Sequence, residues 1–239
     1  NIRRLFEAGY SMKTGIVAPS RQELEPFLKR CENVEATKRS GFEFFTATLF
    51  DKELVCVICG ICKTNAACAT QALLDGFDVS RVFLLGVCGA ISPSLKIKDT
   101  IVCTSVAHHD VEQSILTQNE PRFASAAFEC DKTLLNAVQR AELNGLPYGV
   151  KLVYGKEVTG ESFVDREGRE QIVAAHSPLG VDMETAAAAQ VCALNRVPFL
   201  ALRTVTDTPF ESGLEVFGKN LASASEICAL ALYETLKQL

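Results

Sequence analysis

The chain has 239 residues, of which 48% are hydrophobic, with a formal net charge of −5 and an isoelectric point near 5.4. This length allows one sizeable core, and the acidic balance with scattered Lys and Arg argues against a nucleic-acid partner. No apolar run approaches the roughly 20 residues that cross a bilayer, and residues 1–15 lack the apolar core of a signal peptide, so we expect a soluble protein that is not exported.

The first half of the chain alternates apolar, β-prone runs with helical patterns. Ser20 precedes Glu23 by three residues, which is the S-x-x-E capping box of a helix N-terminus. Gly60 separates a continuous apolar run from an alanine-rich helical pattern. The predicted elements are, in chain order, strand Lys13–Ala18, a helix over 21–31, strand Phe42–Phe50, strand Leu54–Cys59, a helix over 63–77, strand Val82–Leu85 and strand Thr100–Val106.

The second half continues the alternation. Its predicted elements are helix Asp131–Asn144, strand Gly149–Tyr154, helix Arg166–Ala175, helix Glu184–Asn195, strand Pro198–Val205 and helix Asn220–Leu236. Apolar strands that alternate with helices favour a mixed, mostly parallel sheet covered on both faces. We therefore predict the α/β class, as a three-layer α/β/α sandwich that forms a single domain over residues 12–239. Residues 1–11 are then an N-terminal extension or a remnant of the expression sequence.

The ten cysteines and three histidines do not indicate a cofactor. Most cysteines lie in apolar stretches, as buried free thiols do. Cys56, Cys59 and Cys62 have the spacing C-x2-C-x2-C, but no fourth cysteine followed by proline completes an iron–sulfur pattern. The histidines are too few and too spread for a metal site. We therefore expect no metal and no redox cofactor.

Acidic residues stand where a parallel sheet binds its ligands, outside the carboxyl ends of the strands. Asp207 follows an apolar strand and Glu184 opens an alanine-rich helix. Each fits a cleft, but a turn residue and a helix-dipole charge explain them equally well. The glycines of GVCGAI let a ligand approach the backbone, yet this segment matches no phosphate-binding loop. The residues by themselves indicate an α/β enzyme with acidic strand ends.

Six segments in order resemble one family. They are GIVAPSRQELEPF, GICKTNAA, GVCGAISPSLKIKDTIV with HHD, VTGESFV, VDMETAAAAQVC and VPFLALRTVTD. Together they resemble the nucleoside phosphorylase and nucleosidase superfamily, most closely its 5′-methylthioadenosine/S-adenosylhomocysteine nucleosidases. The resemblance, which runs from about Met12 to the C-terminus, implies hydrolysis of the N-glycosidic bond of these purine nucleosides, with release of adenine. It also implies a cytoplasmic homodimer that needs no cofactor.

The resemblance implies a role for each matching residue. Asp207 would protonate N7 of the purine, and Glu23, helped by Arg203, would prepare the attacking water. Glu184 would accept hydrogen bonds from the ribose hydroxyls, and the Val164 backbone would hold the base. The other implied substrate contacts are Met183, Phe163, Ile61, Val87, Gly89, Thr206 and Phe217, with Gln113 and Leu116 supplied by a partner subunit.

Several positions depart from the family pattern and keep alternatives open. Ser20 and Val87 replace the usual methionine and serine near the ribose, and Gln113 and Leu116 make the 5′ pocket more polar. Futalosine and 5′-deoxyadenosine therefore stay possible substrates. Phosphorylases of the superfamily carry an early PGDP-x-R segment where this chain has VAPSRQE, which favours hydrolysis, although Arg21 leaves phosphate use open. A third alternative is a nucleoside-binding protein without catalysis.

Overall fold

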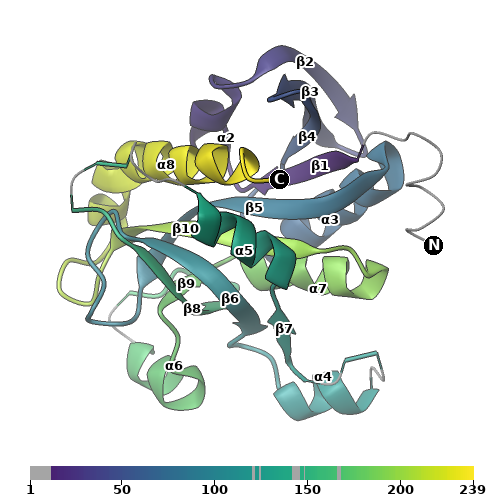
Figure 1. The fold of residues 1–239 in the computed structure, drawn as a ribbon. Coiled ribbons are helices and arrows are strands. Elements are labelled where there is room, and N and C mark those ends of the chain that lie inside the picture. The colour runs from purple at the N-terminus through teal and green to yellow at the C-terminus, as the bar shows by residue number, and fades with distance from the viewer. Residues whose placement is uncertain (1–11, 120–121, 124, 142–145, 148, 166–167) are drawn as a thin grey trace.

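The computed structural model describes residues 12–119, 122–123, 125–141, 146–147, 149–165 and 168–239 (Figure 1). The N-terminal extension predicted over residues 1–11 lies outside this part of the chain. In chain order the elements are β1 (Lys13–Ala18), α2 (Arg21–Leu28), β2 (Glu32–Arg39), β3 (Phe42–Leu49), β4 (Lys52–Ile58), α3 (Lys63–Phe77), β5 (Val79–Ala90), β6 (Thr100–His108), α4 (Gln113–Asn119), β7 (Ala127–Glu129), α5 (Lys132–Arg140), β8 (Leu152–Thr159), α6 (Arg169–His176), β9 (Gly180–Asp182), α7 (Thr185–Asn195), β10 (Phe199–Asp207) and α8 (Leu214–Leu236).

The strands of the described residues form one mixed sheet in the order β10-β6-β8-β9-β5-β1-β4-β3-β2, with β7 beside β6. Parallel pairs join β4, β1, β5 and β10, and also β6, β8 and β9. The hairpin β2–β3–β4 and the pairs β10–β6, β5–β9 and β6–β7 are antiparallel. Because β10 also pairs with β5, the strands β10, β6, β8, β9 and β5 close into a ring.

Helices cover both faces of this sheet. Helices α2, α5 and α8 lie together on one side, where α8 packs on β10 and β5, and α3 and α7 lie together on the other (Figure 1). A strand between two helical layers needs apolar side chains in both directions. All nine residues of β10 are accordingly buried. The predicted three-layer α/β architecture is confirmed.

The structure differs from the sequence expectation mainly where side chains are polar. Strand β2 was not predicted because its sequence ENVEATKR is exposed along its whole length and has no apolar alternation. The charged residues of this outermost strand are typical of a sheet edge. Strand β8 begins at Leu152 rather than Gly149, and α8 begins at Leu214 rather than Asn220. The end of the helix predicted to reach Asn144 lies outside the described residues.

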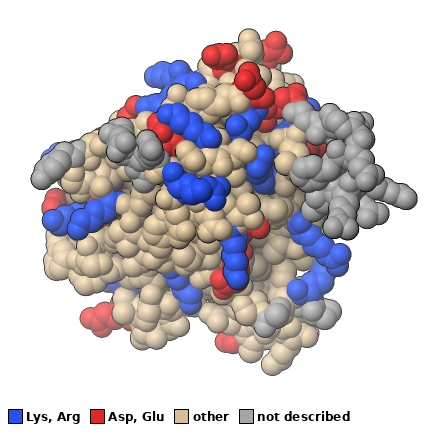
Figure 2. All heavy atoms as spheres, viewed as in Figure 1, with Lys and Arg blue, Asp and Glu red and all other residues tan. Residues whose placement is uncertain are grey.

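None of the helices in the described ranges is long and apolar enough to cross a bilayer. On the face in Figure 2, Lys and Arg side chains are separated by uncharged surface and have acidic side chains among them.

Candidate active site

A pocket of about 280 Å³ opens at the carboxyl ends of β1, β5 and β10. It brings together residues that are far apart in the sequence, as expected where parallel strands of a sheet end side by side. The predicted residues that line it are Glu23, Ile61, Val87, Gly89, Phe163, Val164, Met183, Glu184, Arg203, Asp207 and Phe217. Its lining also includes residues that the sequence did not single out, namely Pro19, Cys88, Ser162, Val181, Asp182 and Leu214.

Glu23 enters the pocket from the first turn of α2. The Ser20 hydroxyl oxygen accepts the Glu23 N–H, as the capping box predicts. The Glu23 carboxylate does not complete that box: it accepts the Ser20 hydroxyl at 2.7 Å and the Val87 N–H at 3.0 Å. Burial raises the pKa of Glu23, against the opposing effect of Arg203. The result is a fixed and more basic carboxylate.

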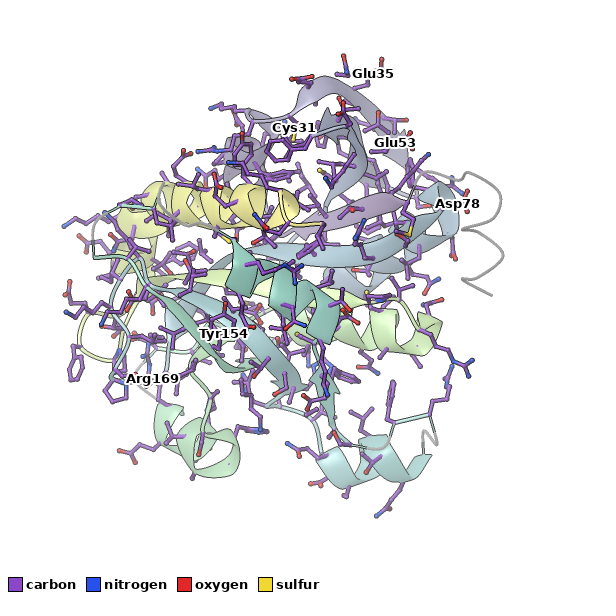
Figure 3. The ribbon with its side chains drawn as sticks, viewed as in Figure 1. Cys31, Glu35, Glu53, Asp78, Tyr154 and Arg169 are labelled. Atoms are coloured by element: carbon purple, nitrogen blue, oxygen red, sulfur yellow. The ribbon has the colours of Figure 1, made fainter. Side chains whose placement is uncertain are left out.

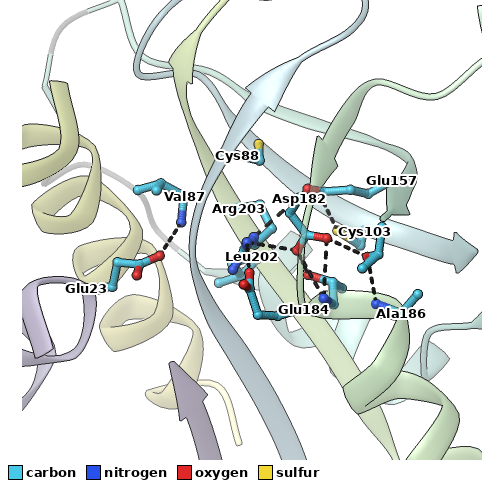
Figure 4. A network of polar contacts seen from close by, with 12 residues as sticks. Glu23, Val87, Cys88, Cys103, Glu157, Asp182, Glu184, Ala186, Leu202 and Arg203 are labelled. Carbon is cyan, nitrogen blue, oxygen red and sulfur yellow. Dashed lines mark hydrogen bonds and ion pairs between the residues drawn. The ribbon is translucent and has the colours of Figure 1, made fainter. Parts of the chain in front are cut away.

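Arg203 lies at the centre of a buried acidic cluster (Figure 4). Its Nη2 donates to Asp182 at 2.8 Å and to Glu184 at 3.0 Å. Its Nη1 is buried and has no hydrogen-bond partner among the described residues. A Cβ at Gly86 would stand 2.4 Å from this Nη1 and 2.6 Å from Oε1 of Glu23, so only glycine leaves room for both groups. Arg203 thus keeps a donor available beside Glu23.

Glu184 is held between two donors. Its Oε1 accepts the Cys62 N–H at 3.0 Å, and its Oε2 accepts Arg203. Cys62 stands before α3 with φ of 83°, a conformation that non-glycine residues rarely adopt and that is frequent at functional sites. Burial raises the pKa of Glu184, and Arg203 opposes this. Both carboxylate oxygens are therefore fixed at the wall of the pocket.

Asp207 ends β10 at a bulge that turns its side chain toward the pocket. The register with β5 shifts between Val205 and Asp207. The Thr206 hydroxyl lies 3.0 Å from Oδ1 of Asp207 and 3.0 Å from the Cys88 carbonyl. A carbonyl only accepts, so this hydroxyl either shares its proton or receives one from Asp207. Burial raises the pKa of Asp207, while Thr206 and Arg169 lower it.

The mouth of the pocket is apolar. Phe163 and Phe217 meet edge to face, with ring centroids 6.1 Å apart. Ile61 is 47% exposed and Leu214 is 70% exposed. Exposed apolar side chains around a cleft with a few fixed polar groups are typical of a site for a small organic ligand.

Three of the predicted contacts lie away from the pocket lining. Thr206 is behind Asp207, where its hydroxyl bonds the carboxyl. Gln113 lies on α4, with its Nε2 3.3 Å from Nδ1 of His176. Leu116 lines a separate groove with Val111. Within one chain the structure does not bring Gln113 and Leu116 to the substrate pocket, and their assignment to a partner's pocket stays a prediction.

Three charged residues of the site were missed. Asp182 accepts Arg203 and also the hydroxyls of Thr159 and Thr185. Arg169 contacts Asp207, although its surroundings in the sequence are charged and typical of a solvated helix. Glu157 is fully buried behind Arg203, on a strand with mixed polarity. Asp182 could have been noticed, since it stands within the VDMET segment, but no local signal marks the other two.

We predict that Glu157 makes stability fall with rising pH. Burial raises its pKa from 4.5 to about 8, so the folded state keeps a proton that the unfolded state has already lost. This stability is fully present below about pH 4.5 and is lost as pH rises towards 8, by at most about 1.4 kcal/mol per pH unit. In Glu157→Gln, the amide stays neutral. Thermal melts from pH 5 to pH 8 should therefore show a flatter decline in Tm for this variant.

The matched control is Glu35→Gln, which changes an exposed glutamate on β2 and should keep the wild-type slope. For a chain of this size, about 1 kcal/mol corresponds to about 2–4 °C in Tm. A Glu157→Gln slope equal to that of the wild type would contradict a proton on Glu157.

Comparisons with known proteins bear on this geometry. The family model described as "Phosphorylase superfamily" matches residues 13–237. The 5′-methylthioadenosine/S-adenosylhomocysteine nucleosidase of Geobacillus kaustophilus is 33% identical over 236 residues, which cover 95% of this chain and 99% of the relative. The nucleosidase of the same name from Neisseria meningitidis, solved in complex with methylthio-immucillin-A, has a TM-score of 0.86 and 30% identity, over 95% of this chain and 99% of that one.

A futalosine hydrolase is also similar in fold. The enzyme of Helicobacter pylori has a TM-score of 0.84 and 25% identity, over 95% of this chain and 98% of that one. The residues matched by the family model include every residue that lines the pocket. The resemblance inferred from the six sequence segments is therefore confirmed.

Proposed function

We propose, since this chain belongs to the phosphorylase superfamily, that it hydrolyses the N-glycosidic bond of 5′-methylthioadenosine and S-adenosylhomocysteine and releases adenine. It is an N-glycosyl hydrolase, as its nucleosidase relatives are. The observation that carries the proposal is the placement of Glu23, Glu184 and Asp207 around one pocket, each with different partners. The pocket therefore contains an acid, a base and a carboxylate that binds the sugar.

The base half of the pocket supplies the leaving-group acid. Asp207 donates its proton to N7 of the purine, so that the base departs neutral as the bond to the sugar breaks. The raised pKa of Asp207 favours the protonated form that this step needs. Phe163 offers a ring face to the purine, and the Val164 backbone holds its edge. Gly89 leaves room for the base beside the carboxyl, since a Cβ there would stand 3.1 Å from Oδ2.

The sugar half of the pocket holds the ribose and the water. Glu184 accepts hydrogen bonds from the ribose hydroxyls, and Met183 packs against the ring. Glu23 orients the water and removes its proton as positive charge develops on the sugar. The available Nη1 of Arg203 donates to the oxygen atoms that gather beside Glu23. The anionic carboxylates also stabilise the oxocarbenium-like sugar electrostatically.

The arginines favour water over phosphate as the nucleophile. Arg21 turns away from the pocket and pairs with Glu43 at 2.5 Å, with its guanidinium over the Phe45 ring. Arg203 and Arg169 are in contact with carboxylates already. A phosphate that entered this pocket would therefore contact acidic side chains, while these two arginines are already paired with carboxylates. This supports hydrolysis rather than phosphorolysis.

The test is adenine release from 5′-methylthioadenosine in phosphate-free buffer, followed by ultraviolet absorbance. The hydrolase should turn over at full rate without phosphate, whereas a phosphorylase needs it and a binding protein releases no base. A panel of 5′-methylthioadenosine, S-adenosylhomocysteine, 5′-deoxyadenosine and futalosine, in which the release of each compound's own base is measured, then defines the substrate. A preference for futalosine would favour the alternative that the polar Gln113 and the similar futalosine hydrolase keep open.

We also propose that two copies of the chain assemble through the groove near α4. This groove is lined mainly by apolar side chains of α3, α7 and the β6–α4 region, among them Ala67, Val111, Leu116 and Leu194. Ile115 beside it is 60% exposed. Burial of this surface in a homodimer would carry Gln113 and Leu116 towards the partner's pocket.

Sedimentation velocity tests the assembly. The wild type should sediment as a dimer, and Val111→Asp should shift it to monomer because a carboxylate would be buried in the interface. Val173→Asp, at a 45% exposed position on α6, is the matched control and should stay dimeric. A monomeric wild type would contradict the proposal.

We place the enzyme in the cytoplasm. The cysteines that the structure describes are free thiols, most of them buried, which suits a reducing compartment. Fractionation of cells that express the protein at natural levels tests this placement, since activity in a membrane or secreted fraction would contradict it.

A further inference from the structure

We propose that Arg169 is a positioning residue that fixes the base half of the pocket and stabilises Asp207 after it has given up its proton. The proposal rests on the proposed function, because it concerns the acid that serves the leaving base. Arg169, labelled in Figure 3, is the first residue of α6, and it does not line the pocket itself. Its action on the reaction must therefore pass through the groups that it contacts.

The guanidinium of Arg169 connects three segments of the site. Its Nε donates to the Asp165 carbonyl at 2.7 Å, and its Nη1 donates to the Ala90 carbonyl at 2.8 Å. Its Nη2 lies 3.4 Å from the Val164 carbonyl and 3.3 Å from Oδ2 of Asp207. One side chain thus joins the loop that bears Val164, the end of β5 and the acid at the end of β10.

The position of Arg169 at the start of α6 does not stabilise that helix. It is the first residue of α6, where the helix dipole disfavours a cation. Arg169 is only 7% exposed, and burial of a guanidinium costs free energy unless its N–H donors have acceptors. The carbonyls and the carboxylate supply those acceptors. In the described contacts, the acceptors that compensate for this unfavourable position lie in the loop that bears Val164, at the end of β5 and at the end of β10.

The contact with Asp207 bears on the proton transfer. The O–H bond of Asp207 breaks, an N7–H bond forms, and the electrons of the glycosidic bond pass to the base. Asp207 is left negative, and Arg169 at Oδ2 stabilises that charge. Burial keeps the proton on Asp207 before the step, and the cation makes its departure easier. Arg169 also fixes the Val164 carbonyl, so that the base and the acid stay aligned.

The experiment compares Arg169→Gln and Arg169→Lys with the wild type, using 5′-methylthioadenosine. Arg169→Gln should lower kcat by about 10²-fold. Arg169→Lys keeps the positive charge but loses the several N–H donors of the planar guanidinium, and it should lower kcat by about 10-fold. Loss of the cation raises the pKa of Asp207, so the basic limb of kcat/KM should move to higher pH in Arg169→Gln. In Arg169→Lys that limb should stay near its wild-type position.

Arg140→Gln is the matched control, because it removes an exposed arginine of α5 that bonds only a carbonyl near the C-terminus in the described contacts. Turnover of Arg169→Gln within about twofold of the wild type would overturn the proposal. Equal losses of kcat in Arg169→Gln and Arg169→Lys, with the basic limb of kcat/KM unmoved, would also overturn the proposal, because a purely structural role predicts that result. If thermal melts show that Arg169→Gln is unfolded, Arg169→Lys decides: the predicted loss of kcat in a variant that keeps the wild-type Tm supports the proposal, and unchanged turnover overturns it. A wild type that releases no adenine refutes the proposed function instead.

Discussion

Glu23→Gln should nearly abolish hydrolysis while leaving binding of an adenine-bearing analogue almost unchanged. Glutamine has the same shape, and its carbonyl can still accept the Val87 N–H that fixes Glu23 at 3.0 Å. It has no basic carboxylate to take a proton from water, so the turnover should fall by about 10²- to 10⁴-fold. Single-turnover adenine release measures the chemical step, and calorimetric titration with a non-hydrolysable analogue measures binding.

Glu25→Gln is the matched control for this variant. Glu25 is on the same helix, two residues away, and pairs with Lys29 at the surface. Its loss should leave both quantities near the wild-type values. A Glu23→Gln rate within about tenfold of the wild type would refute Glu23 as the base, and lost analogue binding would show that its main role is to hold the pocket together.

Asp207→Asn should lower turnover by about 10²-fold or more. The amide oxygen can still accept the hydrogen bond that Arg169 donates to Oδ2 of Asp207, but the amide has no acidic proton to give to N7. The pH profile provides an independent check. Because burial raises the pKa of Asp207, wild-type turnover should decline as pH rises through that pKa, and the decline should be absent in Asp207→Asn. Steady-state rates across the pH range measure both effects.

The control for Asp207→Asn is Asp78→Asn. Asp78 follows α3 in a left-handed conformation that asparagine adopts readily, and Figure 3 shows it far from Arg169 in the fold. An Asp207→Asn enzyme with normal turnover, or one that keeps the basic limb of the wild type, would show that another group protonates the base.

Local patterns were enough to predict much of the fold. Strand β1 and helix α3 have the predicted bounds, because a short β-prone run before Pro19-Ser20 and an alanine-rich helical period are both strong signals. Strand β2 has neither signal, since its partner β3 and not its own sequence makes it a strand. Strand β9 is only three residues long, and it exists because the sheet closes there into a ring.

The site was predictable only in part, for the same reason. Glu23, Glu184 and Asp207 stand next to strand ends or helix starts, and their motifs identify them. Arg169 and Glu157 are buried only because distant strands meet around them, and burial of that kind leaves no mark in the neighbouring residues. The glycines of GVCGAI were expected to admit a ligand, whereas Gly86 also makes room for Arg203 and Glu23.

Hydrolysis of 5′-methylthioadenosine in ¹⁸O-labelled water tests the central claim most directly, because it follows the oxygen that Glu23 is proposed to activate. In phosphate-free buffer the enzyme should release adenine, and mass spectrometry should find one labelled oxygen at C1 of the methylthioribose. Added phosphate should change neither the rate nor the product. Adenine release that begins only when phosphate is added, with an unlabelled sugar 1-phosphate as product, would contradict this account.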